Sequence, residues 1–232
     1  MIAMYKGFFK RLFDILISGT MLILLSPVLA YLAYSIKKNL GSPVIFSQVR
    51  PGKDGKLFRM FKFRSMTDAR DANGKLLPDE DRLPPFGKKL RESSLDELPE
   101  LWNIFKGDMS CVGPRPQLVR DMVFFTPEEM RRQSVYPGLT GLAQISGRNN
   151  ISWKKKFFYD LQYIKDINFF EDVRIMWRTV FKVSAKEDIA TDGMATSEDY
   201  GDWLLHQGLV TQKEYDAKQK EALKLLQDFT KN

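Results

Sequence analysis

The sequence has very little cysteine and histidine: Cys111 and His206 are the only residues of these two types among 232. A single cysteine excludes an internal disulfide framework and fits a reducing compartment. Because protein zinc sites are usually built from several cysteine and histidine ligands, this composition also argues against such a site. Any metal ion is therefore expected to be a hard cation bound by oxygen ligands.

The sequence also lacks internal repeats, low-complexity tracts and the usual DNA- and RNA-binding signatures. Its 36 lysines and arginines outnumber 29 aspartates and glutamates, which gives a formal net charge of +7. This excess favours an anionic partner, such as a phospholipid surface, a nucleic acid or a phosphorylated substrate. The basic residues are interspersed with acidic ones, so we expect no nucleic acid among the partners.

One long apolar segment, residues 12–36, is interrupted by Ser26 and Pro27. At about 1.5 Å per residue it would form a helix of roughly 37 Å, enough to cross a bilayer core of about 30 Å. Basic residues, which favour the cytoplasmic side, flank it at positions 6–11 and again at 37–38. Pro27 bends a helix, and the Ser26 hydroxyl can bond a freed backbone group. The segment is therefore expected to enter the membrane, bend and return.

Two other interpretations of this segment remain open. A straight helix would make a single-pass anchor, and the length of the run permits it. A cleaved signal peptide would need a polar region after a short apolar core, whereas this run stays apolar up to Lys37. If the segment is re-entrant, Asp14 is expected at the depth of the lipid headgroups.

The rest of the chain has the pattern of one compact domain that is mostly helical. β-Branched and aromatic residues at Val44–Val49 and Leu57–Phe63 flank the turn sequence RPGKDGK, which predicts a small β-hairpin. Together with the helices this gives an α+β fold. Helical spacing of apolar residues, and a capping-box sequence TQKE at Thr211, predict helices over Asp96–Phe105, Pro127–Ser134, Trp153–Lys165, Glu171–Val183 and from Thr211 towards Phe229.

One predicted helix is strongly amphipathic. Trp153, Phe157, Leu161 and Ile164 fall on one face, beside the basic run 154–156. Such a helix can lie in an anionic membrane interface. A core-facing helix with a basic outer side has the same pattern, so both interpretations remain open.

Charged residues and turn residues are most densely combined between Lys88 and Pro116. Within this segment Asp96 and Glu97 precede a helical pattern. Ser94 to Glu97 has the spacing of a capping box, so spacing alone favours a helix cap. A helix start also attracts phosphate and keeps a carboxylate ionised, so a nucleophilic aspartate is the alternative if cations or Mg²⁺ reduce the repulsion.

Three basic residues, Lys62, Arg91 and Arg115, are candidates to neutralise phosphate beside the acidic pair. Arg115 stands in GPRP, where two prolines stiffen the backbone around it. Lys62 lies in the alternating sequence FKFRSM, and Arg91 precedes the acidic pair. The glycine-containing sequence YPGLTGLAQISGRN, which ends near Arg148, has no dinucleotide or P-loop spacing, so it does not predict a phosphate site by itself. Taken singly, these sequences also fit a rigid turn, an amphipathic strand and an ordinary loop.

In combination, these motifs point to a known family. The order KFRSM, RESSLDELPELWNIFKGDMS, VGPRP and PGLTGLAQISGRN resembles the bacterial sugar transferases, in particular the small monotopic phosphoglycosyl transferases. The N-terminal apolar segment with Ser26 and Pro27 is similar to theirs. The resemblance covers about residues 6 to 198, and the combination is far more specific than any single motif.

The resemblance implies an architecture and a location. Residues 1–38 would form a re-entrant membrane helix, and residues 39–198 a catalytic domain with interfacial amphipathic helices. The protein would lie on the cytoplasmic face of the bacterial inner membrane, in contact with anionic lipids. Residues 199–232 would be a helical extension, to which the resemblance assigns no role.

The resemblance also implies a reaction: transfer of a phosphosugar from a UDP-sugar to a polyprenol phosphate, such as undecaprenyl phosphate, with release of UMP. Asp96 would be the nucleophile and a contact for Mg²⁺, with Glu97 as its partner. The resemblance places four basic residues against phosphate oxygens: Lys62, Arg91, Arg115 and also Arg148. An aspartyl phosphosugar intermediate and ping-pong kinetics would follow, at the start of glycoconjugate assembly.

Two alternatives are kept beside this reaction. In the first, the lipid phosphate attacks the UDP-sugar directly, without a protein-bound intermediate. In the second, the chain is a non-catalytic membrane-anchored scaffold whose basic face binds anionic lipid or, less favoured by the interspersed acidic residues, RNA. The identity of the sugar, the pathway and the oligomeric state are left open, because donor discrimination depends on pocket contacts that one sequence does not locate.

Overall fold

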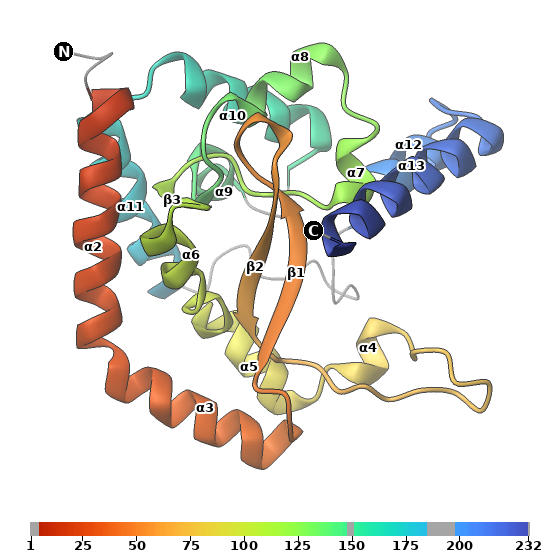
Figure 1. The fold of residues 1–232 in the computed structure, drawn as a ribbon, viewed down its shortest axis with the longest axis horizontal. Coiled ribbons are helices and arrows are strands. Elements are labelled where there is room, and N and C mark those ends of the chain that lie inside the picture. Colours follow the sequence, from red (N-terminus) through yellow and green to blue (C-terminus); the bar gives the residue numbers. More distant parts are fainter. Residues whose placement is uncertain (1–4, 148–150, 185–197, 232) are drawn as a thin grey trace.

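The computed structural model describes residues 5–147, 151–184 and 198–231. The fold is mostly helical with two small sheets, which confirms the predicted α+β class (Figure 1). The helices are η1 (Tyr5–Phe9), α2 (Lys10–Leu24), α3 (Ser26–Leu40), η2 (Lys53–Gly55), α4 (Asp79–Arg82), α5 (Pro85–Glu92), η3 (Leu95–Glu97), α6 (Glu100–Lys106), α7 (Val119–Met122), α8 (Pro127–Met130), η4 (Arg131–Ser134), α9 (Leu142–Ile145), α10 (Trp153–Lys165), α11 (Phe169–Ser184), α12 (Tyr200–His206) and α13 (Gln212–Lys231). The strands are β1 (Ile45–Pro51), β2 (Leu57–Phe63), β3 (Ser110–Val112) and β4 (Gly138–Thr140).

The apolar N-terminal segment forms two helices, α2 and α3, joined by a sharp bend at Leu25 (Figure 1). The Ser26 hydroxyl donates to the Ile23 carbonyl at 2.8 Å, as expected for a polar side chain beside a helix break. Among the described residues, no single helix is long and apolar enough to cross a membrane. The residues Tyr5–Leu24 and Ser26–Leu40, bent by 62°, meet that criterion only as a pair.

Asp14 of α2 lies inside the protein, where the sequence analysis expects it at the depth of headgroups. Its side chain is only 3% exposed. Its Oδ1 accepts hydrogen bonds from the Ser110 hydroxyl at 3.0 Å and from the Cys111 amide at 2.8 Å. A polar residue of the apolar segment therefore joins α2 to strand β3.

A second polar contact joins α2 to α10 and α11. The Asp172 carboxylate accepts from the Tyr5 hydroxyl at 2.7 Å, from the Lys10 ammonium at 2.5 Å and from the Tyr163 hydroxyl at 2.6 Å. These four residues are called the anchor cluster below. All of its donors point at one carboxylate that is 1% exposed.

The predicted hairpin is confirmed by strands β1 and β2, which pair antiparallel from Ile45 opposite Phe63 to Pro51 opposite Leu57. Strands β3 and β4 pair in parallel, with Ser110 opposite Gly138. The backbones after and within these strands approach very closely. A Cβ on Gly138 would lie 2.1 Å from the Gly113 nitrogen, and a Cβ on Gly113 would lie 2.5 Å from the Tyr136 carbonyl oxygen. Only glycine fits these two positions.

Helix α10 has the predicted bounds but not the proposed membrane face. Trp153, Phe157 and Ile164 are each less than a tenth exposed and belong to the hydrophobic core. The interpretation of this face as a membrane contact is therefore wrong, and the core-facing alternative is right. An apolar helix face is favoured both against a protein core and in a membrane interface, so the sequence pattern cannot distinguish the two.

The final helix α13 begins as predicted. The Glu214 amide donates to the Thr211 hydroxyl at 3.3 Å and the Thr211 amide to the Glu214 carboxylate at 2.8 Å, which is a capping box. Together with α12, this helix packs on α7 (Figure 1). The C-terminal residues therefore form part of the packed structure.

Candidate active site

The acidic pair lies in a turn of 3₁₀-helix, η3, and the helix predicted over Asp96–Phe105 is split. Ser94 has a φ of 54° and makes no capping hydrogen bond, so the capping box favoured by the spacing is wrong. Helix α6 starts only at Glu100, after Pro99. The Glu97 side chain is used for contacts with cations from other parts of the chain.

Two cations hold the Glu97 carboxylate. The Lys62 ammonium on β2 donates to Glu97 Oε1 at 2.8 Å, and an Arg115 nitrogen donates to the same oxygen at 2.7 Å. Lys62 also lies 3.1 Å from the carboxylate of Glu100. Lys62, Asp96, Glu97, Glu100 and Arg115 are called the site cluster below. Two of the four predicted basic residues, Lys62 and Arg115, therefore contact the acidic pair. A third, Arg91, lies close enough for its charge to act on Asp96.

The surroundings shift the pKa values of the two adjacent carboxyl groups in opposite directions. Burial, followed by the charge of Glu97, raises the pKa of Asp96 to about 6. Burial also opposes ionisation of Glu97, but Arg115 and Lys62 outweigh it and hold the pKa of Glu97 well below its usual range. Glu97 is therefore a permanent anion, whereas Asp96 is a more basic carboxylate than an ordinary aspartate.

Glu100 is a member of the site cluster that the sequence analysis missed. It is 2% exposed, and its Oε1 forms an ion pair with the Lys62 ammonium at 3.1 Å. Burial raises the pKa of Glu100 to about 7, against the charge of Lys62. Its position three residues after Glu97, in the sequence DELPE, is the only local signal that could have pointed to it.

The remaining candidates differ in their placement. Arg91 donates to the Ser65 hydroxyl at 3.0 Å and lies 2.7 Å from the Met66 sulfur. These contacts tie helix α5 to the segment after β2. Arg148 lies outside the described residues, so its position relative to the site stays a prediction.

The loop that carries Arg115 is held from behind by buried polar contacts. Arg132, which is 3% exposed, donates to the Arg115 carbonyl at 2.7 Å and pairs with Asp160 at 2.6 Å. Arg50 donates to the Pro116 carbonyl at 3.3 Å. The Arg115 side chain itself is 43% exposed, so a ligand can reach it while its backbone stays fixed.

The described acidic residues do not form a ready-made metal site. The residues that the structure describes contain no group of three or more His, Cys, Asp or Glu side chains able to hold a metal ion. The Glu97 carboxylate is already bound by two cations. Asp96 fits as a single oxygen ligand, and Mg²⁺ commonly takes one or two carboxylates while substrate phosphates and water supply the rest.

Comparison with known proteins places the sequence in a family. The model of the family described as bacterial sugar transferase matches residues 5–186. EpsL of Bacillus subtilis, described as an uncharacterized sugar transferase, is 47% identical over 189 residues, which cover 82% of this chain and 94% of EpsL.

Two larger relatives carry more specific names. The UDP-glucose:undecaprenyl-phosphate glucose-1-phosphate transferase of Klebsiella pneumoniae is 42% identical over 184 residues, 75% of this chain and 40% of that protein. The undecaprenyl-phosphate galactose phosphotransferase of Salmonella typhimurium is 35% identical over 198 residues, 78% of this chain and 41% of that protein. The matched region thus makes up about two fifths of each of these two relatives. The chain therefore belongs to the bacterial sugar transferase family of enzymes.

Proposed function

We propose that this chain transfers a phosphosugar from a UDP-sugar to a polyprenol phosphate, with release of UMP. The observation that carries the proposal is a buried Asp96 beside a Glu97 that two cations hold. Names of the relatives from Klebsiella and Salmonella, which refer to undecaprenyl phosphate and to glucose or galactose phosphate, support the substrate class. The product would begin the assembly of a lipid-linked glycoconjugate.

The proposed reaction has two displacements at one phosphorus atom. An Asp96 carboxylate oxygen attacks the β-phosphorus of the UDP-sugar, the bond from that phosphorus to the bridging oxygen breaks, and UMP leaves with the electron pair. An oxygen of the polyprenol phosphate then attacks the same phosphorus, and the aspartate oxygen leaves as a carboxylate. A covalent intermediate lets a water-soluble donor depart before the lipid acceptor arrives.

The cations of the site cluster would do most of the electrostatic work. Arg115, through its exposed side chain, can contact phosphate oxygens while Glu97 fixes its orientation. Lys62 is held between Glu97 and Glu100, so its charge stays near the acidic pair. A pKa of about 6 leaves Asp96 ionised at neutral pH, yet makes it a better nucleophile than a fully solvated carboxylate.

The family resemblance implies Mg²⁺, and Asp96 is the residue that would hold it. When bound to the diphosphate, the ion would neutralise part of its negative charge. Asp96 and the diphosphate are both negatively charged and repel each other. The positive charges of Lys62, Arg91 and Arg115 reduce this repulsion.

The covalent step can be tested by trapping. Wild-type protein is incubated with a UDP-sugar labelled in the sugar, without lipid acceptor, and we expect label bound to the protein. Asp96→Asn should retain no label and lose at least about 10³-fold in turnover, since an amide is a very poor nucleophile. Asp68→Asn, at an aspartate whose side chain is 66% exposed, is the matched control and should label normally.

The other outcomes select the alternatives. Turnover without any trapped label favours direct attack by the lipid phosphate. Full function of Asp96→Asn favours the non-catalytic scaffold. A panel of UDP-sugars assayed for UMP release then identifies the donor. Rates must be compared across the panel, because the pocket contacts that select a sugar contribute only about 1 to 3 kcal/mol each.

The protein is further proposed to lie on the cytoplasmic face of the inner membrane, in contact with anionic lipids. The bent pair α2 and α3 exposes Leu16, Ile23 and Tyr31, and such an apolar surface needs an apolar environment. Basic flanks at both ends favour re-entry over a straight span.

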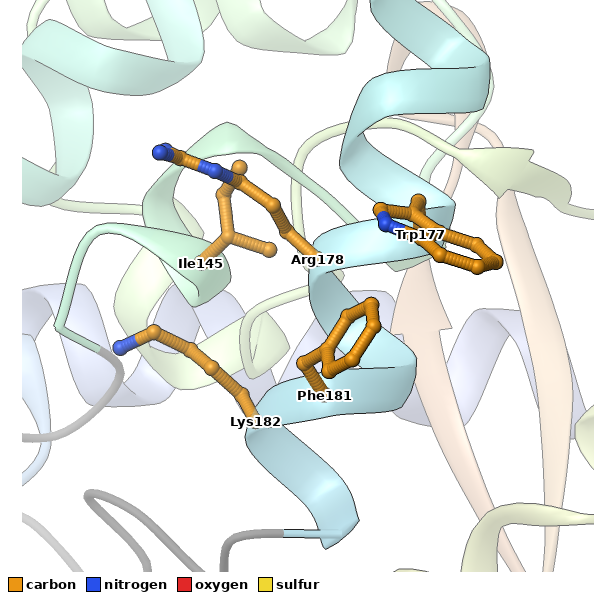
Figure 2. A pocket seen from close by; sticks show the side chains of 5 residues that line it. All are labelled: Ile145, Trp177, Arg178, Phe181 and Lys182. Atoms are coloured by element: carbon orange, nitrogen blue, oxygen red, sulfur yellow. The ribbon is translucent and has the colours of Figure 1, made fainter.

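Helix α11 adds an apolar outer face, which replaces α10 as the proposed interfacial helix. Phe170 is 82% exposed and Trp177 is 65% exposed. A shallow hollow of about 460 Å³ lies at the end of this helix. Figure 2 shows Arg178 and Lys182 reaching to the same side of α11, while the Trp177 ring lies on the other side. Aromatic rings beside cations are typical of a helix that contacts an anionic lipid surface.

A further inference from the structure

The C-terminal helices α12 and α13 lie beyond residue 186, where the family match ends. They pack against α7, a helix of only four residues that begins shortly after the Arg115 loop. A helix this short has almost no intrinsic stability, so its position depends on its neighbours. Those neighbours include strand β1 and both C-terminal helices, which lie beside α7 (Figure 1).

Polar contacts from both C-terminal helices converge on Arg120 of α7. Its guanidinium donates to Asp202 at 2.8 Å and to the Tyr215 hydroxyl at 2.8 Å, and it lies 3.3 Å from the Asp199 carboxylate. Tyr215 and Asp202 also hydrogen-bond each other. The Gln219 side chain donates to the Arg120 carbonyl at 3.4 Å. The backbone and the side chain of Arg120 are therefore both held.

Further contacts hold the residues next to Arg120. The Gly201 amide donates to the carboxylate of Asp121, which is 1% exposed, at 3.3 Å. Ala222 of α13 packs in one apolar cluster with Val119 and Val123. Residues on both sides of Arg120 in the sequence are thus held by α12 and α13.

A second set of contacts reaches the other side of the Arg115 loop. Tyr200 of α12 packs against Trp153 and Phe157 of α10, with ring centroids 5.2 and 5.1 Å away. The Arg132 guanidinium lies over the Phe157 ring at 5.9 Å and donates to the Arg115 carbonyl. The C-terminal helices therefore contact the supports on both sides of this loop.

We propose that residues 198–231 are a positioning element for Arg115, which fix the loop 113–116 through α7 on one side and through the aromatic cluster around Tyr200 on the other. The effect on turnover rests on the proposed function, but the effect on the loop does not. Misplacing a positioned cation by about 1 Å is enough to slow a reaction that depends on charge alignment.

The test uses the full chain with two conservative changes, Tyr215→Phe and Asp202→Asn, singly and together. They remove partners of Arg120 without creating a cavity. Lys218→Gln is the matched control, because it breaks an exposed ion pair with Glu221 on the same helix α13. Hydrogen exchange reports on the loop through the Gly113 and Gly138 amides, which donate to the Thr140 and Pro114 carbonyls.

The double variant should exchange the Gly113 and Gly138 amides at least about 10-fold faster than the wild type, while the α6 amides and the control keep their rates. Unchanged protection of the two amides, or faster exchange throughout the protein, overturns the proposal. This measurement needs no substrate, so it decides the proposal even if the chain fails to use a UDP-sugar.

Kinetics supply the second readout. The double variant should lose roughly 3- to 10-fold in kcat, and the same changes placed in an Arg115→Gln background should have little further effect, because the positioned group is already absent. Equal losses in both backgrounds would mean that the C-terminal helices contribute general stability only, and would overturn the positioning role.

Discussion

The molecule buries two clusters of charged side chains, and they are satisfied to different degrees. In the anchor cluster, one carboxylate, Asp172, accepts hydrogen bonds from Tyr5, Lys10 and Tyr163, so each of these three donors is paired with it. The site cluster has three carboxylates and only two cations, so its charges are not fully paired.

Exposure differs in the same direction. The Lys10 side chain is 12% exposed, whereas that of Arg115 is 43% exposed. A closed and fully paired cluster holds two parts of a protein together, but it has no capacity left for a ligand. An incompletely paired cluster with a reachable cation can bind phosphate, and it lowers the stability of the free protein in return.

The largest expected effect comes from breaking the anchor cluster. Asp172→Asn leaves the Lys10 ammonium buried without a counter-charge, and we expect a loss of about 3 to 5 kcal/mol in unfolding free energy. Denaturant unfolding of the purified protein in detergent measures it. Glu221→Gln, at an exposed pair, should cost less than about 0.5 kcal/mol. A loss below about 1 kcal/mol for Asp172→Asn would remove the distinction between the clusters.

In the site cluster, by contrast, removing one negative charge should raise the unfolding free energy, and only at higher pH. Burial raises the pKa of Glu100 from 4.5 to about 7, so the folded protein retains a proton that the unfolded chain loses. Its contribution to stability therefore falls as pH rises from about 4.5 to about 7 and stays low above that. Glu100→Gln mimics the protonated form. Relative to the wild type, it should gain about 3 kcal/mol in stability between pH 4.5 and pH 8.

Unfolding measured at both pH values checks this sign. A constant difference between Glu100→Gln and the wild type across that range would show that Glu100 titrates normally. A detergent whose own charge changes with pH would alter the measured stability, so the protein is kept in a non-ionic detergent throughout.

The smallest expected effect concerns the surroundings of the anchor cluster. Leu16 on α2 and Leu223 on α13 are both 58% exposed, which makes them a matched pair. Leu16→Lys should weaken retention on anionic vesicles by roughly 10-fold, since a lysine costs about 2.5 to 3.5 kcal/mol at the centre of a bilayer and less near its surface. Leu223→Lys should leave retention unchanged. Similar losses for both variants would mean that the apolar surface of α2 is not distinguished by contact with lipid.

Local patterns in the sequence predicted local structure well. The hairpin strands, the bounds of α10 and the capping box at Thr211 each depend on residues within a few positions, and the structure confirms them. The break at Ser26 and Pro27 belongs to the same class, because its hydrogen bond reaches only to Ile23. The family resemblance, which combines several motifs, is confirmed by the family match.

The site was harder to predict because its partners are distant in the sequence. Glu97 has the spacing of a helix cap, but Lys62 and Arg115 approach from other elements and take its carboxylate. Glu100 has no motif of its own, and its role depends on burial that only the packing of α6 against β2 creates. The burial of the apolar face of α10 likewise depends on partners in α12.

The close approach of backbones after β3 and within β4 has a consequence for efforts to change the donor sugar. Gly113 and Gly138 have no room for even a methyl group, and neither does Gly141, where a Cβ would lie 2.2 Å from the Gly113 carbonyl oxygen. Libraries that randomise codons near Arg115 should therefore leave these three unchanged. Diversity belongs in side chains around this rigid frame, where selection can act on chemistry instead of on the survival of the fold.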